Sequence, residues 1–465
     1  VPAARKESML DPAIFKSYDA RGLYPSQLDE AGAGAVARAF ASLVEAKTLV
    51  VARDVRASGP QLAAAATEAL LAAGVDVLDI GVVSTDMFYY AVATLPVDGG
   101  FTISASHNPK DWNGFNFCRR GAQPLALGSG LNQVRDRAVA ELAAGPPPPA
   151  ARRGRREERD LWDGFADYVL SYVDRALIPP LRLVADGNCG MQVRALERIV
   201  ARGRLPLDID ARHGEPDGSF PVPGGVPNPL LPENHGPLSA AVRAARADLG
   251  VAWDADGDRC FFVDATGYFL SGYFATAILA RSILRRTPGA TIVIDPRSIW
   301  ATQETIAELG GKTVLSRAGM TIIPDKMRET GAEFGGEMSA HFYFRKNWYR
   351  DNGMIPLLIL LELLGRERTR LEDLVRPLRQ KYFTSGEINF EVHDPAAMVA
   401  SAQKQFTDGA QDFTDGLSVA YADWRFNLRP SNTEPLLRLN VEARSQAALE
   451  RGEARVRAVL DRAGK

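Results

Sequence analysis

Thr48-Leu-Val-Val-Ala52 is a short apolar run that leads to Asp54, to a turn at Ser58-Gly-Pro60 and then to an alanine-rich segment. A second apolar run follows at Val75–Ile80. Apolar β-type runs that alternate with amphipathic helices are typical of βαβ units, in which helices cover both faces of a mainly parallel sheet. This stretch therefore predicts an α/β domain.

The same order of strand, aspartate, helix and strand recurs twice further along the chain. The runs Leu181–Ala185 and Thr291–Ile294 lead to Asp186 and Asp295. The helices and second strands expected behind them are Arg194–Val200 with Leu207–Ile209, and Gln303–Leu309 with Lys312–Leu315. Three such units, each more than a hundred residues from the next, predict triplication of one α/β domain with a mainly parallel mixed sheet.

The C-terminal part of the chain has a different order of elements. Short strands come first and a charged amphipathic helix closes the chain, which predicts an α+β domain. The strands expected there are Phe390–Val392, Leu417–Tyr421, Arg425–Leu428 and Leu436–Val441, and the helix is Ser445–Ala463. The sequence thus predicts four domains, which we expect at residues 1–150, 151–256, 257–370 and 371–465.

A proline-rich segment separates the first two domains. Gly145 is followed by four prolines, which cannot donate ladder hydrogen bonds or continue a helix. The arginine-rich stretch behind it, residues 152–159, also contains Glu157 and Glu158. Interleaved charges of both signs favour the solvated start of a helix over an anion-binding patch.

The composition excludes several classes of protein. With 46% hydrophobic and 24% charged residues, the chain of 465 residues has the composition of a soluble globular protein. A formal net charge of −2 gives no support for nucleic acid or an anionic membrane as a partner. Three distant cysteines and an N-terminus without an apolar stretch predict a reducing compartment, the cytoplasm. The apolar run Met354–Leu364 is interrupted by Pro356 and Glu362, so we expect a buried helix rather than a membrane span.

The loop Thr102-Ile-Ser-Ala-Ser-His-Asn-Pro109 follows an apolar stretch. It is therefore expected at the end of a strand, where open α/β sheets place their ligands. The hydroxyl of Ser106 stands beside the imidazole of His107, and Pro109 stops regular structure. The loop suits a nucleophile held in a stiff backbone, and taken alone it suits an ordinary polar turn as well.

A second loop, Asp254-Ala-Asp-Gly-Asp-Arg259, directly follows an expected buried strand. Three carboxylates at alternate positions repel one another unless a cation lies among them. An EF-hand is excluded, because its sixth and twelfth positions need Gly and Glu, and here they are Arg259 and Ala265. The three carboxylates predict a Mg²⁺ site that shares the ion with a phosphate, with a solvated acidic turn as the alternative.

Two further loops suit a phosphorylated sugar. Gly335-Gly-Glu-Met-Ser-Ala-His341 has a carboxylate, a hydroxyl and an imidazole at alternate positions, so that on an extended segment all three face sugar hydroxyls. Arg429-Pro-Ser-Asn-Thr-Glu-Pro435 combines a guanidinium, two hydroxyls and a turn rich in N–H groups, which together suit a phosphate. A tight polar hairpin is the alternative for the latter.

The order of these four loops resembles that of the α-D-phosphohexomutases. The resemblance extends from Tyr18-Asp-Ala-Arg-Gly22 to the C-terminal domain, and includes Ser84–Tyr90 and Pro227–Asn234. Gly-Glu-Met-Ser at 336–339 is similar to the phosphomannomutase/phosphoglucomutase branch. The resemblance implies four domains around a central cleft and interconversion of hexose 1-phosphate and hexose 6-phosphate, of mannose or glucose. It also implies a phosphoserine, Mg²⁺, and a hexose 1,6-bisphosphate as intermediate and activator. We expect a monomer or a homodimer.

The resemblance also implies roles for individual residues. Ser106 corresponds to the phosphoserine, beside His107. The residues that correspond to the Mg²⁺ ligands are Asp254, Asp256, Asp258 and an oxygen on Ser106. Arg21 and Arg259 correspond to residues that contact phosphate, and His341 is a further catalytic candidate. The residues that correspond to the sugar and phosphate contacts are Glu337, Ser339, Arg429, Ser431, Asn432 and Thr433.

Three positions depart from the family pattern. Asn116 and Arg297 stand where mutases of this branch commonly have lysine, and Met320 stands where they commonly have histidine. The changes at 116 and 320 remove groups suited to proton transfer or to neutralising phosphate. They favour one alternative function, a weak or silent sugar-phosphate-binding paralogue. A phosphoglucosamine mutase and a phosphatase are further alternatives.

Overall fold

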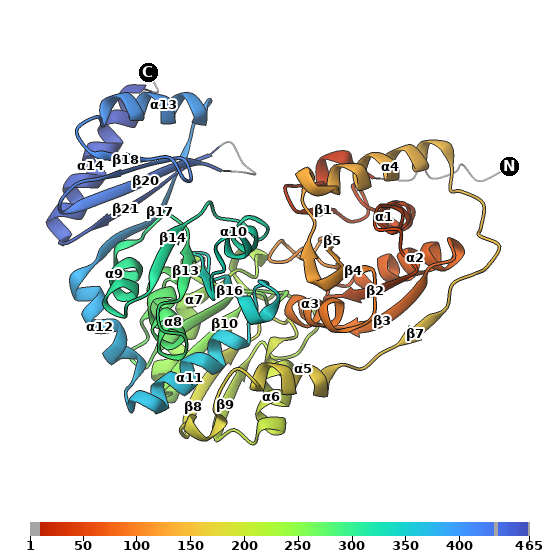
Figure 1. Ribbon diagram of the computed structural model, residues 1–465, viewed down its shortest axis with the longest axis horizontal. Helices are drawn as coiled ribbons and strands as arrows, with labels where there is room; N and C mark the ends of the chain where they lie inside the picture. Colours follow the sequence, from red (N-terminus) through yellow and green to blue (C-terminus); the bar gives the residue numbers. More distant parts are fainter. Residues whose placement is uncertain (1–9, 432–435, 464–465) are drawn as a thin grey trace. The chain divides into compact units, whose positions relative to one another are not determined.

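The computed structural model describes residues 10–431 and 436–463. The chain divides into two compact units, Val1–Phe269 with Arg350–Glu362, and Leu270–Tyr349 with Leu363–Lys465. Figure 1 shows the elements of both units in the colours of the sequence. Four sheets are present, which we describe in the order of the chain.

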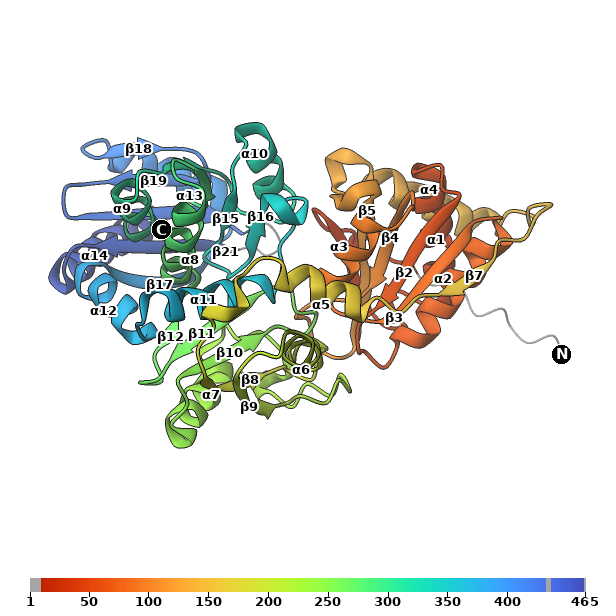
Figure 2. The same cartoon turned by 60° about the horizontal axis from the view of Figure 1, so that its bottom comes forward.

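The first sheet has seven strands, and its middle is parallel. Its strands are β1 (Asp19–Leu23), β2 (Thr48–Arg53), β3 (Asp76–Val82), β4 (Gly99–Ile103), β5 (Trp112–Arg119), β6 (Gln123–Pro124) and β7 (Arg156–Glu158). Their order is β1-β5-β4-β2-β3-β7, with β6 beside β5, and Figure 2 shows β4, β2 and β3 side by side. β2 is parallel to β3 and β4, whereas β5 runs antiparallel to β1 and β4.

Helices surround this sheet and share its hydrophobic core. They are α1 (Glu30–Leu43), α2 (Gly59–Ala72), α3 (Thr85–Thr94) and α4 (Leu131–Ala144). Phe40 of α1, Leu62 of α2 and Val134 of α4 belong to one buried cluster with Phe101 of β4. β4 is buried along its whole length, as expected for a central strand covered on both faces.

The arginine-rich stretch at 152–159 does not begin a helix, so that prediction was wrong. Arg156–Glu158 form β7, which pairs in parallel with β3. Arg152 forms an ion pair with Asp76 at 2.8 Å, and Arg156 forms one with Asp79 at 2.7 Å. Asp79 lies 77 residues before Arg156. The carboxylates that pair with this stretch are therefore on a distant strand, and the residues around 152–159 give no sign of them.

The second sheet has five strands in the order β12-β11-β10-β8-β9. Their bounds are β8 (Leu181–Asp186), β9 (Leu207–Arg212), β10 (Leu249–Trp253), β11 (Cys260–Asp264) and β12 (Phe269–Leu270). β8 is parallel to β9 and β10, and β10 is antiparallel to β11. The accompanying helices are α5 (Trp162–Leu170), α6 (Gln192–Gly203) and α7 (Pro232–Ala245). The predicted strand, helix and strand of this domain are β8, α6 and β9.

The third sheet has the order β14-β13-β15-β16. Its strands are β13 (Thr291–Ile294), β14 (Lys312–Leu315), β15 (Phe334–Gly336) and β16 (Phe342–Phe344). β13 is parallel to β14 and β15, and β15 is antiparallel to β16. The helices of this region are α8 (Gly272–Arg286), α9 (Trp300–Glu308), α10 (Ile322–Thr330), α11 (Ile355–Glu367) and α12 (Leu371–Lys381). Leu357 and Leu361 of α11 are fully buried, which confirms the buried helix predicted from the apolar run.

The fourth sheet is antiparallel throughout, in the order β17-β21-β20-β19-β18. Its strands are β17 (Phe383–Glu391), β18 (Ala410–Asp412), β19 (Leu417–Ala420), β20 (Trp424–Pro430) and β21 (Leu436–Ala443). The helices α13 (Pro395–Gln405) and α14 (Gln446–Ala463) pack on it. Ala402 of α13 and Val456 of α14 share a buried cluster with Phe426 and Leu439 of the sheet. The α+β prediction is confirmed.

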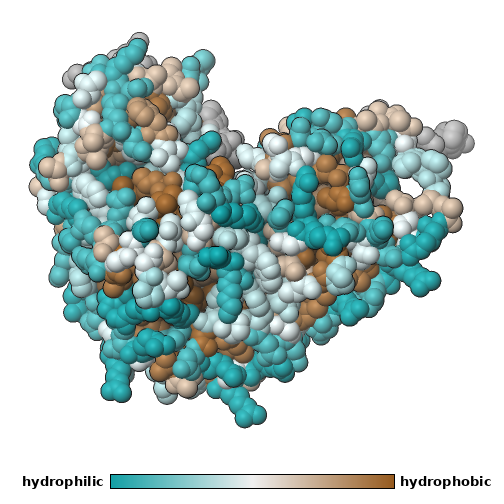
Figure 3. All heavy atoms as spheres, in the orientation of Figure 1, coloured by the Kyte–Doolittle hydropathy of each residue, from teal (hydrophilic) through white to brown (hydrophobic). Residues whose placement is uncertain are grey.

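Two further observations concern cysteine and hydropathy. Cys118, Cys189 and Cys260 are buried thiols. Within residues 10–431 and 436–463, no helix has both the length and the apolar character needed to cross a membrane. The face drawn in Figure 3 is mostly polar, with small apolar patches scattered over it.

Candidate active site

Ser106 lies in the loop that follows β4. Its backbone φ is +49°, a left-handed conformation that costs a non-glycine residue about 1–2 kcal/mol. The N–H of Ser106 donates to Ser104 Oγ at 2.9 Å, and its own Oγ lies 3.0 Å from His107 Nδ1. The serine is buried. The predicted hydroxyl beside an imidazole is therefore present in a loop whose backbone is held under strain.

The three acidic residues of the second loop lie between β10 and β11. The antiparallel pairing of these strands places Trp253 opposite Cys260 and closes the loop tightly. One carboxylate oxygen from each of Asp254, Asp256 and Asp258 lies within 4.8 Å of the others. All three side chains are buried. A solvated acidic turn is therefore excluded.

The electrostatics of this loop fit a bound cation. Burial raises the pKa of Asp254 above its usual range, the charge of Asp256 raises it further, and Arg259 lowers it in part. Burial, followed by the charges of Asp256 and Asp254, also raises the pKa of Asp258. Among the residues that the structure describes, Asp256 Oδ1 is buried without a hydrogen-bond partner. A hard cation would stabilise all three charges together, so these residues could hold a metal ion.

The Ser106 loop and the acidic loop are connected through a histidine and an arginine. Arg259 Nη2 lies 3.0 Å from His107 Nδ1, and Arg259 Nε lies 3.3 Å from Asp254 Oδ2. Because a guanidinium is always a donor, Nδ1 of His107 accepts this hydrogen bond and carries no proton. Ser106 Oγ lies at the same unprotonated nitrogen, so Arg259 and the serine hydroxyl share its one lone pair, and this nitrogen is the nearest base to the serine.

Thr85, the first residue of α3, joins the first domain to the acidic loop. Its Oγ1 donates to Asp256 Oδ2 at 2.9 Å, and its backbone N–H donates to the backbone carbonyl of Asp256 at 2.9 Å. Thr85 is buried. The sequence analysis did not identify this contact, which orients one carboxylate of the candidate metal site from outside the loop.

Arg21, on β1, contacts the Ser106 loop although the two lie far apart in the sequence. It forms an ion pair with Asp19 at 2.6 Å and donates to Asn108 Oδ1 at 3.1 Å. Asn108 is two residues from Ser106. The antiparallel pairing of β1 with β5 fixes Arg21 opposite Gly114, so the sheet register places this guanidinium near the serine loop.

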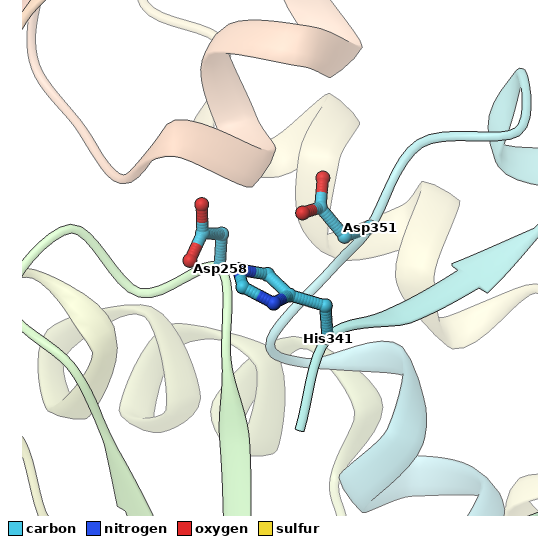
Figure 4. Close-up of side chains that lie close together, drawn as sticks. All are labelled: Asp258, His341 and Asp351. Carbon is cyan, nitrogen blue, oxygen red and sulfur yellow. The ribbon is translucent and has the colours of Figure 1, made fainter. Parts of the chain in front are cut away.

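A fourth carboxylate, missed by the sequence analysis, lies near the acidic loop. One oxygen of Asp351 lies within 4.8 Å of one oxygen of Asp258. Figure 4 shows both side chains, Asp258 on the loop before β11 and Asp351 on the segment before α11. Asp351 is buried, and Arg350 Nη2 lies 3.9 Å from it. A lone aspartate about 90 residues from the acidic loop carries no local signal, so only the fold brings the two together.

In the second unit, the predicted sugar-binding loop joins β15 to β16. Ser339 Oγ donates to Glu337 Oε2 at 2.9 Å and lies 3.0 Å from His341 Nδ1. The single hydroxyl proton of Ser339 is donated to Glu337. The Ser339 oxygen therefore accepts a hydrogen bond from His341, whose Nδ1 carries the proton. Tyr343 OH and the backbone N–H of Gly319 also donate to Glu337, at 2.8 and 3.0 Å. The loop therefore holds its polar groups in one fixed arrangement.

The predicted phosphate-binding arginine is part of a cationic cluster. Arg429 Nη2 lies 3.2 Å from Glu387 Oε2, Arg438 Nη1 lies 3.1 Å from Glu387 Oε1, and Arg297 Nη1 lies 3.8 Å from Glu387 Oε2. One carboxylate thus faces three guanidinium groups. Burial lowers the pKa of Arg429, the charge of Arg297 lowers it further, and Glu387 raises it. In the part of the chain described, Arg429 Nε has no hydrogen-bond partner.

Arg297 is also paired with Asp295, so the capacity for another anion comes from Arg429 and Arg438, two guanidinium groups that share the one carboxylate of Glu387. Ser431 lies at the end of β20, and its N–H donates to the carbonyl of Leu436 across the hairpin at 2.8 Å. Asn432 and Thr433 lie outside the described residues.

The positions that depart from the family pattern have defined partners. Asn116 Nδ2 donates to Tyr89 OH at 2.9 Å, so the amide belongs to a polar contact of β5 with α3. Arg297 forms two hydrogen bonds to Asp295, at 2.8 and 2.9 Å. Met320 is buried.

Comparison with known proteins places this geometry in a family. Models of phosphoglucomutase/phosphomannomutase domains I, II, III and IV match residues 12–130, 163–267, 271–382 and 387–459. A phosphomannomutase of Salmonella typhimurium is 43% identical over 452 residues, covering 96% of this chain and 98% of that protein. A protein of Xanthomonas campestris pv. campestris named as phosphohexose mutases is 43% identical over 440 residues, covering 94% and 96%. The crystal structure of a phosphoglucomutase/phosphomannomutase family protein from Burkholderia thailandensis superimposes with a TM-score of 0.88 at 32% identity, covering 98% of both chains.

The chain belongs to the phosphoglucomutase/phosphomannomutase family. The prediction of four domains and the resemblance stated from the four loops are confirmed, and the domain bounds expected from the sequence remain predictions. As a family member across almost its whole length, the chain is an enzyme, a sugar-phosphate mutase.

Proposed function

We propose that this enzyme interconverts hexose 1-phosphate and hexose 6-phosphate, of mannose or glucose, through a phosphorylated Ser106 and a hexose 1,6-bisphosphate intermediate. The observation that supports this best is the chain of contacts from Ser106 through His107 and Arg259 to Asp254. It joins a nucleophile, a base, a permanent positive charge and a candidate metal ligand within one unit. These are the groups that phosphoryl transfer requires.

In this proposal the first unit performs the transfer. Asp254, Asp256, Asp258 and an oxygen on Ser106 hold Mg²⁺, which when bound supplies positive charge to the phosphoryl oxygens. Arg21 and Arg259 neutralise the same oxygens from the protein. The Nδ1 of His107 accepts the proton of Ser106 Oγ when the serine is phosphorylated and returns it when the serine leaves.

The second unit binds the rest of the substrate. The carboxylate of Glu337 accepts hydrogen bonds from sugar hydroxyls, and the hydroxyl of Ser339 donates to them. His341 lies beside both residues. Arg429 binds the phosphate that is not being transferred, together with Ser431, Asn432 and Thr433. Binding energy from that remote phosphate fixes the sugar for reaction at its other end.

The cycle consists of two phosphoryl transfers, the first from Ser106 to the sugar and the second from the sugar to Ser106. The bond from phosphorus to Ser106 Oγ breaks, a bond from phosphorus to the free sugar hydroxyl forms, and the hydroxyl proton passes to Ser106 by way of His107. This step gives hexose 1,6-bisphosphate. After the bisphosphate turns end over end, Ser106 Oγ takes its other phosphoryl group. The bond from phosphorus to that sugar oxygen breaks, the serine proton passes to the sugar oxygen by way of His107, and the isomeric monophosphate leaves. A trace of bisphosphate would phosphorylate Ser106 in resting enzyme and act as activator.

The experiment is to incubate the protein with Mg²⁺, a trace of glucose 1,6-bisphosphate and mannose 1-phosphate, glucose 1-phosphate or glucosamine 1-phosphate, and to follow the products by ³¹P NMR. We expect the 6-phosphate of mannose or glucose and no product from Ser106→Ala. Preference for glucosamine 1-phosphate would assign a different sugar. Steady release of inorganic phosphate would identify a phosphatase. No product from any sugar, with Ser106 shown to be phosphorylated, would refute the proposal.

A second candidate function is a weak or silent sugar-phosphate binder. It is favoured by the amide of Asn116, which is bonded to Tyr89 and brings no positive charge where the family pattern has lysine. Calorimetry that detects hexose phosphate binding without turnover would support this candidate. A faster rate in Asn116→Lys would instead indicate an enzyme with a missing charge.

A further inference from the structure

Each of the three α/β domains carries the same short turn at the end of one parallel strand. The turns are Asp54-Val-Arg56 after β2, Asp186-Gly-Asn188 at the end of β8 and Asp295-Pro-Arg297 after β13. In each, Oδ1 of the aspartate accepts the backbone N–H of the residue two positions later at 3.0 Å. The three aspartates that repeat along the sequence therefore close the same type of turn in each of the three domains.

Each turn contacts the candidate loop of its own domain. β2, β8 and β13 pair in parallel with β4, β10 and β15, the strands that precede the Ser106, acidic and Glu337 loops. Figure 2 shows β2 beside β4. Asn188 Nδ2 donates to the carbonyl of Trp253 at 2.6 Å, just before the acidic loop. Asp295 Oδ2 accepts from the N–H of Met338 at 2.7 Å, directly after Glu337.

The first turn makes the largest number of such contacts, through Arg56. Its Nε donates to Asp54 Oδ2 at 3.1 Å. Its two terminal nitrogens donate to four backbone carbonyls. Three belong to the Ser106 loop, which are Ser106 O at 2.6 Å, Asn108 O at 2.7 Å and Pro109 O at 2.6 Å, and the fourth is Trp112 O at 2.9 Å, at the start of β5. One side chain therefore binds four carbonyls within seven consecutive residues.

This arrangement excludes substrate binding by Arg56. A guanidinium has five N–H donors, and all five are used inside the protein. The group is fully buried, and the ring of Phe220 lies 5.0 Å from its central carbon. Lysine cannot replace it, because an ammonium has three donors on one atom and cannot span four separate carbonyls. The hydrogen bonds of Arg56 therefore go to Asp54, to the Ser106 loop and to the first residue of β5.

We propose that Arg56 is a positioning residue for phosphoryl transfer, which holds the loop so that Ser106 Oγ stays beside His107. This inference rests on the proposed function of Ser106. It explains how Ser106 keeps a φ of +49° in a segment without helix or strand: the carbonyl of the serine and three carbonyls that follow it are bound to one rigid, planar group. Misplacement of a reacting group by about 1 Å can cost about 100-fold in rate.

The test compares Arg56→Lys with Arg38→Lys, a matched control in the same domain. Arg38 lies on α1 and pairs with Glu141 of α4, away from the loop. Two quantities are measured: hydrogen exchange of the amides at 104–112, and the single-turnover rate of phosphoryl transfer from phosphorylated Ser106 to hexose 6-phosphate. In Arg56→Lys we expect exchange to rise about tenfold or more, the factor for loss of one charge-assisted hydrogen bond. We expect the transfer rate to fall about 100-fold, with KM within about twofold. Arg38→Lys should change neither quantity.

Two results would overturn the proposal. Unchanged exchange at 104–112 in folded Arg56→Lys would show that Arg56 does not hold the loop. Raised exchange with an unchanged transfer rate per folded molecule would show a purely structural role. If Arg56→Lys does not fold, Asp54→Asn replaces it: the variant keeps the donors of the four carbonyl contacts, but its amide nitrogen takes the place of the Oδ2 that accepts from Arg56 Nε. A smaller rise in exchange and a smaller loss of rate are expected, and no change in either would overturn the proposal.

Failure of the proposed function gives a different result. If phosphorylated Ser106 of the wild type transfers its phosphoryl group to no sugar, the proposed function of Ser106 is wrong. The role of Arg56 is still tested, by hydrogen exchange and by the rate at which phosphorylated Ser106 is hydrolysed by water. We expect that hydrolysis rate to change in Arg56→Lys and to stay constant in Arg38→Lys. An equal rate in both variants would count against the proposal.

Discussion

The contact between Thr85 and Asp256 leads to a prediction about metal affinity. Thr85→Val removes one hydroxyl and keeps nearly the same shape, so the buried site is neither emptied nor enlarged. The hydrogen bond lost is the one from Thr85 Oγ1 to Asp256 Oδ2 at 2.9 Å. The backbone N–H of Thr85, which donates to the carbonyl of Asp256, remains in place and preserves the loop.

Two arguments give the expected size of the effect. A hydrogen bond to a charged group contributes about 1.5–3 kcal/mol. Loss of a residue that orients a metal ligand typically weakens metal binding by about 10–100-fold, which corresponds to about 1.4–2.7 kcal/mol. The two ranges agree. The effect should fall in the upper half of the range, because the bond to Oδ2 is lost from a carboxylate whose Oδ1 has no hydrogen-bond partner within the described structure.

The assay is calorimetric titration of the metal-free protein with Mg²⁺ and with Mn²⁺ at fixed pH. Thr94→Val is the matched control, because Thr94 ends the same helix and its hydroxyl donates only to the carbonyl of Tyr90, at 2.7 Å. We expect weaker binding of both ions to Thr85→Val and unchanged binding to Thr94→Val. Equal affinity in wild type and Thr85→Val would refute the assignment of Asp256 as a ligand.

Three further predictions concern other parts of the molecule. Ser106→Ala should abolish turnover while its thermal unfolding and metal binding stay close to wild type, and residual turnover above background would contradict the phosphoserine. Arg429→Ala should weaken hexose phosphate binding by about 2 kcal/mol in calorimetry, since it removes a charge-assisted contact, with little change in Mg²⁺ affinity; unchanged sugar-phosphate affinity would remove Arg429 from the phosphate site. Burial raises the pKa of Asp86 from 3.8 to about 6. Because the folded-state pKa is the higher one, the stabilisation is complete below about pH 3.8 and is lost as pH rises through 6, by about 3 kcal/mol at pH 8. Urea unfolding of wild type and Asp86→Asn at pH 4.5 and 8 should show about 2 kcal/mol of this difference, because the remainder is already lost at pH 4.5; parallel pH dependences would contradict it.

Local patterns predicted most of the regular structure and the main loops. β2, β8 and β13 are short apolar runs that end in aspartate, and their burial between layers makes the pattern visible in sequence. The acidic loop was identifiable because its three carboxylates are adjacent in sequence and repel one another. The sugar loop was predicted on an extended segment, and that part of the prediction is wrong, because the N–H of Ala340 donates to the carbonyl of Glu337 and closes a turn. The predicted carboxylate, hydroxyl and imidazole still meet, through the contacts of Ser339 with Glu337 and His341.

The features that sequence analysis missed depend on contacts between distant segments. Asp351 reaches Asp258, and Thr85 reaches Asp256, only after two sheets have formed and packed. Arg56 was part of a recognised repeat, but its four carbonyl partners are backbone atoms, which have no signature in sequence. The strand β7 was missed for the same reason, because its partner carboxylates lie on β3.

Glu387 has a kinetic consequence for the proposed cycle. Its carboxylate already forms ion pairs with Arg297, Arg429 and Arg438. A phosphate that binds there therefore competes with the carboxylate of Glu387 for these guanidinium groups. Such competition shortens the residence time of the phosphate by raising its dissociation rate. A bisphosphate that must release one end and return by the other within a single catalytic cycle requires fast dissociation at this position. A tighter cluster of arginines alone would slow that exchange.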